Sequence, residues 1–277
     1  MHYDHSAHIN NEEIASTVKS QFSDHQFMLL INTLRASGAL GLVGSLFIVI
    51  SFLWIGRKSR QFPQHLIFWL GLSDGALALS LLMGTFKDPK TGLSVTWCHI
   101  QAFNAQFWAL ANILWVLVIA VKLYLRYRFD VEAKVLQEWH VPSHCLCWGL
   151  PAITCLVITA IRGWGSGPAW CWIGGDDRLF IARFVGFYLY VIGVFIAILI
   201  IYIMLIARIL KRAPKVFSST VLEDLDDYFE NEQSLRKKIT FRVSLYLLSF
   251  IIAWGGGLVN RVYGWWTGGH VSFVLWM

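Results

Sequence analysis

Long windows without charged residues dominate the chain. Five of them contain no Lys, Arg, Asp or Glu, namely residues 36–56, 91–121, 139–161, 184–207 and 243–260. A sixth window, residues 61–86, is interrupted only by Asp74. A bilayer core about 30 Å thick requires about 20 apolar residues in a helix, because each residue adds only 1.5 Å. The pattern therefore predicts an all-α membrane protein that crosses the bilayer several times.

A seventh apolar segment begins just before the sequence ends. Only residues 270–277 follow Gly269, and the apolar residues 271–277 extend about 10 Å as a helix. We therefore expect a seven-transmembrane helix bundle in which helix seven is truncated at the C-terminus, with its remainder encoded beyond Met277. The predicted organisation is an extracellular tail at residues 1–34 followed by a seven-helix core at residues 35–277.

Composition agrees with a membrane protein. Hydrophobic residues make up 56% of the chain and charged residues 14%, whereas a soluble domain carries about 25% charged residues. The net charge of +6 does not indicate nucleic acid as a partner, because no basic patch interleaved with aromatic residues lies outside the apolar windows. The positive excess is instead expected to face membrane lipids and an intracellular partner.

Basic residues in the predicted connections indicate the orientation. Connections on the amino-terminal side hold 7 Lys and Arg residues and those on the opposite side hold 14, with Arg183 and Arg242 left out as helix ends. Since short cytoplasmic loops are enriched in Lys and Arg, this bias predicts an amino terminus outside the cell. We expect the protein to lie in the plasma membrane.

Two cysteines lie outside the predicted bilayer centre. Cys98 opens the third helix on the outer side, and Cys171 lies in the outer loop after the fourth. Both face an oxidising compartment, so a disulfide can form there and would hold the second outer loop over the mouth of the bundle. Two unrelated thiols are the alternative.

Asp74 is the only acidic residue near the centre of a predicted helix. Placing such a residue in a membrane costs about 2.5 to 3.5 kcal/mol on insertion scales. It should therefore point into the bundle towards a partner, for which Asn112 is suitable. One interpretation is a switch whose hydrogen bonds differ between resting and active states. The other is a structural carboxyl group with all its hydrogen bonds satisfied.

The third helix carries polar and tryptophan residues at steps of three or four. They are Gln101, Asn104, Trp108, Asn112 and Trp115. This spacing places them on one helix face, which should line the interior of the bundle. The first three lie in the outer half, where a ligand would enter, and Trp170 and Trp172 flank Cys171 and could form a lid.

Four short motifs are more specific. They are Leu-Ser-Asp at residues 72–74, Trp-Cys at 97–98, Gly-Pro-Ala-Trp-Cys-Trp-Ile-Gly at 167–174 and Asn-Arg at 260–261. Together with seven helices and an outside amino terminus they resemble G-protein-coupled receptors. Within that group they resemble the slime-mould cyclic AMP receptors and, more closely, the plant receptor-like protein related to them. The resemblance covers residues 35–277, and the loop around Cys171 is its strongest part.

The resemblance implies an extracellular ligand, a heterotrimeric G protein on the cytoplasmic side and outward movement of helix six. The expected G-protein contacts are Arg126, Arg128, Arg236, Lys237, Lys238 and Arg242, with anchoring to lipid phosphates as the alternative. An anionic ligand would be met by Arg162, Arg178 or Arg183, for which headgroup contact is the alternative. Helix six contains Trp254, a further switch candidate, before three glycines. The glycines could let the helix bend or could serve close packing.

Other classes have weaker support in the sequence. There is no nucleophile–base pair, zinc-binding His-Glu-x-x-His motif or phosphate loop, so we expect no enzyme, metal or cofactor. Nor do paired repeats or broken helices indicate a transporter. Two rivals to the receptor remain. One is a seven-helix protein that signals or scaffolds without a G protein, and the other is a truncated, non-functional receptor fragment.

Overall fold

The computed structural model describes residues 24–54, 64–84, 95–129, 131–166, 170–174 and 179–211, together with 249, 252, 254–256 and 259. The helices are α2 (Asp24–Trp54), α3 (Gln64–Gly84), α4 (Val95–Arg128), α5 (Ala133–Glu138), α6 (His140–His144), α7 (Leu150–Ala160), α8 (Phe180–Arg183) and α9 (Leu189–Lys211). Two π-helical turns, η2 (Cys145–Gly149) and η4 (Phe184–Tyr188), join α6 to α7 and α8 to α9. Two short strands, β1 (Trp164–Ser166) and β2 (Cys171–Ile173), follow α7.

Five helical segments within the described residues are long and apolar enough to cross a membrane. They are His25–Trp54, Gln64–Gly84, Val95–Arg126, His140–Ala160 and Phe180–Met204. These segments confirm the first five predicted windows and the all-α membrane class. The sixth window is described only at residues 249, 252, 254–256 and 259, and the truncated seventh helix lies outside the described residues. The first helix begins at Asp24, inside the predicted tail, because residues 27–34 are mostly apolar and continue the span on the other side of Arg35.

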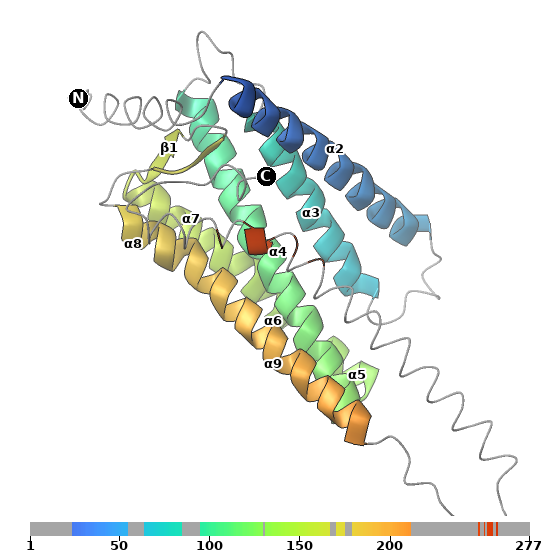
Figure 1. The fold of residues 1–277 in the computed structure, drawn as a ribbon. Helices are drawn as coiled ribbons and strands as arrows, with labels where there is room; N and C mark the ends of the chain where they lie inside the picture. The colour runs from blue at the N-terminus through green and yellow to red at the C-terminus, as the bar shows by residue number, and fades with distance from the viewer. Residues whose placement is uncertain are drawn as a thin grey trace, which may run out of the picture.

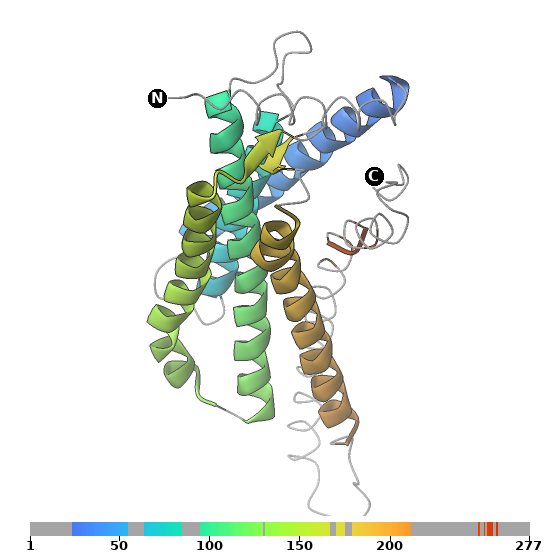
Figure 2. The same ribbon diagram turned by 90° about the vertical axis from the view of Figure 1, so that its left-hand side faces the viewer.

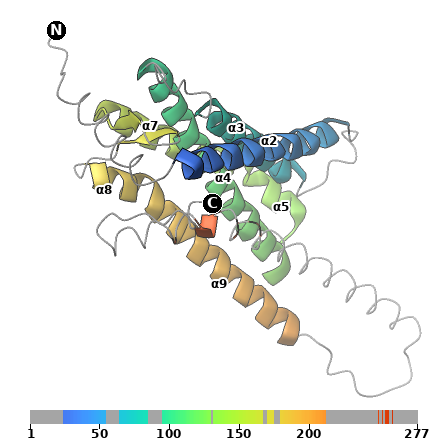
Figure 3. The ribbon, with the colours of Figure 1, turned by 45° about the horizontal axis from the view of Figure 1, so that its top comes forward.

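Helix α4 is the centre of the described bundle. It contacts α3, α7, η2, α9 and both strands. In Figure 2 it stands between α7 and α9, while α2 and α3 run side by side on another flank in Figures 1 and 3. Within its apolar window 56% of residues are buried, against 17% in the first span. Polar side chains on α4 therefore have to find partners inside the protein.

Glycines let α2 and α3 approach each other closely. A Cβ at Gly75 would lie 2.5 Å from Ser45 Oγ, and one at Gly71 would lie 2.8 Å from Ile48 Cγ2. Helices in a membrane associate largely through such close packing of small residues, because lipid is as apolar as the side chains it would replace.

A turn at the end of α7 directs the chain into the hairpin formed by β1 and β2. Arg162 has a left-handed backbone conformation with φ of 54°. Its N–H donates to the Thr159 carbonyl at 3.0 Å, and the N–H of Gly163 donates to the Ile158 carbonyl at 2.8 Å. This is a Schellman C-cap, which ends a helix by reversing the chain. The strands then pair antiparallel, with Ser166 opposite Cys171.

Candidate functional site

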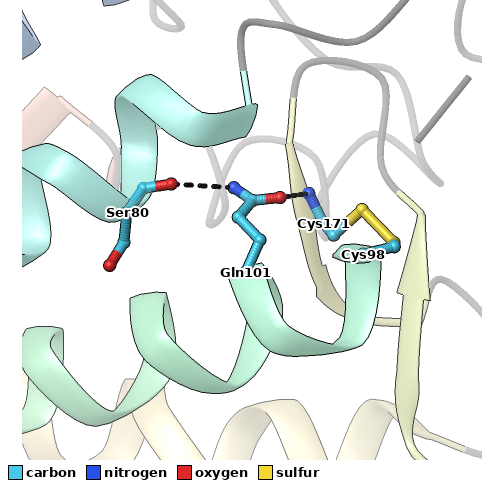
Figure 4. Close-up of a disulfide and its surroundings, with 4 residues drawn as sticks. All are labelled: Ser80, Cys98, Gln101 and Cys171. Carbon is cyan, nitrogen blue, oxygen red and sulfur yellow. Dashed lines mark hydrogen bonds between the residues drawn. A yellow bond between two sulfur atoms is a disulfide. The ribbon is translucent and has the colours of Figure 1, made fainter. Parts of the chain in front are cut away.

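A disulfide joins the hairpin to the start of α4. Cys98 and Cys171 have Cα atoms 5.3 Å apart and are both buried, and Figure 4 shows the bridge between α4 and β2. The bridge predicted from the sequence is confirmed. It holds β2 against the first turn of α4, so the hairpin covers that end of the bundle.

Gln101 holds the hairpin from below. Its Oε1 accepts a hydrogen bond from the backbone N–H of Cys171 at 2.8 Å, and its Nε2 donates to the Ser80 carbonyl at 3.3 Å (Figure 4). The side chain is 1% exposed, and the missing side chain of Gly84 leaves the space it needs, since a Cβ there would lie 2.5 Å from Nε2. Both polar atoms of this predicted ligand contact are therefore engaged within the protein, and Gln101 connects β2, α3 and α4.

Gln106 makes a second connection that sequence reasoning missed. Its Oε1 accepts from Trp172 Nε1 at 2.6 Å, and its Nε2 donates to the Gly186 carbonyl at 2.8 Å. The side chain is fully buried. Gly186 lies in the π-helical turn η4, and such turns are frequent at functional positions. Gln106 lies off the predicted polar face, but an amide inside an apolar window was itself a usable signal, because it needs partners there.

Aromatic contacts continue from the hairpin into the bundle. The Trp172 ring lies 5.2 Å from Phe187 and 5.8 Å from Tyr188, both in edge-to-face geometry. Phe187 in turn lies 5.6 Å from Trp254, the predicted switch residue of helix six. Trp170, unlike Trp172, packs against Leu30 and its neighbours on α2. The two tryptophans beside Cys171 thus contact opposite flanks of the bundle.

Asp74 and Asn112 meet as expected from the sequence. Asn112 Nδ2 donates a hydrogen bond to Asp74 Oδ1, which links α4 to α3. Asn112 is buried, whereas Asp74 keeps an exposed surface. The pair has the contact that a switch requires, and its role as a switch stays a prediction.

The two tryptophans of the predicted polar face pack inside the helical layer, whereas Asn104 is half-buried. Asn104 Nδ2 bonds to the carbonyl of Ile100 on its own helix at 2.8 Å. Trp108 and Trp115 both contact Trp148 of η2, with ring centroids 5.8 and 5.7 Å away. Within the described ranges the buried Nε1 of Trp115 has no hydrogen-bond partner. Asn112 therefore faces α3 and the two tryptophans face η2.

The predicted basic contacts are only partly described. Arg183 ends α8 and is half-buried, whereas Arg178 lies outside the described residues. At the other end of α4, Arg126 Nη1 donates to the Val131 carbonyl at 2.8 Å, and Arg128 lies 5.3 Å from the Phe129 ring. The remaining predicted G-protein contacts lie outside the described residues, namely Arg236, Lys237, Lys238 and Arg242. In the part of the chain that is described, no group of three acidic, His or Cys residues is arranged to hold a metal ion.

Comparison of the sequence with known proteins identifies a matching family. Residues 20–267 match the family described as slime mold cyclic AMP receptor. Cyclic AMP receptor-like protein A of Dictyostelium discoideum is 26% identical over 251 residues, which cover 91% of this chain and 60% of that protein. Cyclic AMP receptor 4 of the same organism is 26% identical over 226 residues, or 79% of this chain and 46% of that protein.

A fungal relative extends the comparison. The ascaroside receptor GPR2 of Arthrobotrys oligospora is 28% identical over 199 residues, which cover 68% of this chain and 46% of that protein. The chain spans about half the length of the curated relatives it matches. The predicted resemblance to the slime-mould receptors is thus confirmed, and the closer likeness to a plant protein stays a prediction.

Proposed function

Because the chain belongs to the slime mold cyclic AMP receptor family, we propose that it is a cell-surface receptor that transmits an extracellular signal to a heterotrimeric G protein. The observation that carries the proposal is the aromatic path Trp172–Phe187–Trp254, which runs from the disulfide-bound hairpin to helix six. The names of the relatives add support, since two of them are called receptors for cyclic AMP or an ascaroside.

The disulfide supports the proposed orientation. A bridge between Cys98 and Cys171 is stable where the compartment is oxidising, which is outside the cell. With an outside amino terminus in the plasma membrane, the hairpin faces the extracellular space and the Arg126 end of α4 faces the cytoplasm.

In the proposed mechanism the ligand binds beneath the hairpin. Asn104, Trp108, Trp170, Trp172, Arg178 and Arg183 remain the contact candidates. Gln101 acts as a positioning residue, because both its amide atoms already bond to the protein. Its part is to keep β2 at a fixed height above α3 and α4.

Signal transfer then follows from a shift between two bundle states. A ligand that contacts Trp172 favours the state in which Trp172, Phe187 and Trp254 are arranged to suit it, and it can shift the equilibrium only by its difference in affinity for the two states. Rearrangement of the Asp74–Asn112 pair accompanies this shift, and outward movement of helix six opens the basic surface to the G protein.

The test is ligand-stimulated nucleotide exchange on a Gα subunit, with the full chain in lipid nanodiscs. Cyclic AMP and an ascaroside are the two probes, chosen from the relatives. Phe187→Leu is compared with Phe180→Leu, whose side chain on α8 is exposed. We expect Phe187→Leu to retain probe binding and to lower stimulated exchange about tenfold, as loss of a typical coupling energy would. Phe180→Leu should behave as the wild type.

One result would contradict the G-protein assignment, and another would contradict the role of the aromatic path. If no Gα subunit responds while a probe binds the wild-type protein, the G-protein assignment fails and signalling without a G protein takes its place. If exchange responds but Phe187→Leu matches the control, the receptor assignment stands and the aromatic path does not carry the signal.

A further inference from the structure

A second polar cluster lies at the end of α4 opposite the disulfide. It consists of His65 near the start of α3, Lys122 near the end of α4, and His140 and His144 on α6. We call these four residues the basic cluster. The proposed signalling path does not use it, and three different helices contribute to it.

The members of the basic cluster are close to one another. Ring centroids are 6.2 Å apart for His65 and His140 and 4.5 Å apart for His140 and His144. Lys122 is near enough to interact electrostatically with both His140 and His144. His144 Nδ1 accepts a hydrogen bond from Trp148 Nε1 at 2.9 Å, so the proton of its neutral ring lies on Nε2, which remains a donor.

Lys122 has no counter-ion among the residues that the structure describes. The side chain is 3% exposed, and its one hydrogen bond to a described residue is a long one of 3.4 Å from Nζ to the Trp139 carbonyl. Within the described ranges no carboxylate forms an ion pair with Lys122, and its neighbours His140 and His144 cannot supply negative charge. The nearby thiol of Cys147 is buried, which favours its neutral form. Buried charges in proteins are usually paired, because an isolated one loses its hydration without compensation. A lysine inside a membrane span without a paired acid therefore points to a ligand.

The side chains of the basic cluster indicate an anion as the ligand. Metal binding is disfavoured, because the described His, Cys and acidic residues do not form a group with metal-binding geometry. The cluster instead offers an ammonium group and several imidazole N–H donors, which suit the oxygens of a phosphate. Its position favours a phosphate that arrives with lipid. Trp139, 52% exposed beside His140, is a residue type enriched at the membrane–water interface.

We propose that the basic cluster binds the phosphate group of an anionic phospholipid at this face of the membrane. His65 is exposed and His140 is partly exposed, so they offer the accessible edge. Lys122 is buried near His140 and His144 and has no paired acid in the described part of the chain. The side of the membrane rests on the proposed function, in which this end is cytoplasmic. The binding itself does not depend on G-protein coupling.

The test measures lipid binding to the purified full chain in detergent by native mass spectrometry. The probes are phosphatidylinositol 4-phosphate, phosphatidylcholine and, as a soluble competitor, inorganic phosphate. Lys122→Met is compared with Lys134→Gln, which removes one positive charge from an exposed position on the nearby α5. His65→Gln, at an exposed position, is the second variant, and His25→Gln at the far end of α2 is its control.

We expect the wild-type protein to bind the phosphoinositide in preference to phosphatidylcholine. Lys122→Met should weaken that binding about fivefold, the effect of one basic side chain at an anionic surface, while Lys134→Gln leaves it unchanged. His65→Gln should also weaken it, so the proposal stays testable if Lys122→Met fails to fold. Competition by inorganic phosphate would support the phosphate site but assign it to a soluble phosphate group.

Other outcomes would overturn the proposal. One is equal binding of the phosphoinositide and phosphatidylcholine by the wild-type protein. Another is an equal loss in Lys122→Met and Lys134→Gln, which would mean a diffuse charge effect without a site. Because no G protein takes part in this measurement, its failure is distinct from failure of the proposed receptor function.

Discussion

The two ends of α4 bury polar groups in opposite ways. At the disulfide end, Gln101 and Gln106 are fully buried and each uses both amide atoms in hydrogen bonds to other elements. At the other end, Lys122 is equally buried but has one long hydrogen bond to a described residue and no paired acid among the described residues. A satisfied network makes the structure more rigid, whereas an incomplete one costs free energy until another molecule completes it. The disulfide end of α4 therefore serves stability, whereas the Lys122 end suits the ligand that we propose.

The largest expected effect comes from breaking the disulfide end. Replacing both Cys98 and Cys171 by serine releases a bridge between residues 73 positions apart, which the chain-entropy account values at about 4 kcal/mol. We expect the unfolding free energy, measured by thermal or denaturant unfolding in detergent, to fall by an amount of this order. Cys145→Ser, at an exposed free thiol, is the control. Equal stability of the double variant and the control would mean that the hydrogen bonds alone hold the hairpin.

The second-largest loss of stability is expected for Gln106→Leu. It leaves Trp172 Nε1 and the Gly186 carbonyl without their partner, and each buried unsatisfied group costs about 1 to 3 kcal/mol. We expect the unfolding free energy to fall by about 2 to 3 kcal/mol, the lower part of the summed range, because Trp172 is only half-buried. Gln137→Leu on α5, at an exposed position, should change it little. If the two variants unfold alike, the link from the hairpin to η4 contributes nothing to stability.

Lys122→Met tests the other end of α4, where we expect the substitution to keep or raise the unfolding free energy instead of lowering it. In phosphatidylcholine without anionic lipid, replacing a buried lysine that has no paired acid among the described residues by an apolar side chain of similar length should leave stability unchanged or raise it by about 1 kcal/mol. The measurement is thermal unfolding beside Gln106→Leu under the same conditions. Destabilisation as large as that of Gln106→Leu would show that Lys122 is already satisfied within the protein.

The smallest effect concerns the turn that leads into the hairpin. Arg162 occupies a left-handed conformation with φ of 54°, which glycine adopts without steric cost. Arg162→Gly should raise the unfolding free energy by about 0.5 kcal/mol, and Arg162→Ala, which keeps a Cβ, should not. Thermal unfolding of the two variants decides the matter. A gain in both would point to the lost arginine side chain as the cause.

Several features of the site were predictable because they follow from local chemistry or from simple pairing. Cys98 and Cys171 were the cysteines outside the bilayer centre, and Asp74 needed a partner that Asn112 could provide, so both contacts could be named in advance. Gln101 was placed on the correct helix but given a ligand as its partner. In the structure its amide bonds to the backbone of Ser80 and Cys171, and backbone groups leave no signature in a sequence. Its contact with a ligand stays a prediction.

The sequence by itself determined which segments enter the membrane, because bilayer thickness imposes a length of apolar residues that charge-free windows reveal directly. It also determined the resemblance to the receptor family, through the motifs around Cys98 and Cys171. Only the tertiary structure decided that Gln106 connects Trp172 to η4 and that Lys122 lies among His65, His140 and His144. Those contacts join residues on different helices. They depend on how each helix is rotated about its axis and packed against its neighbours, which periodicity within one helix does not specify.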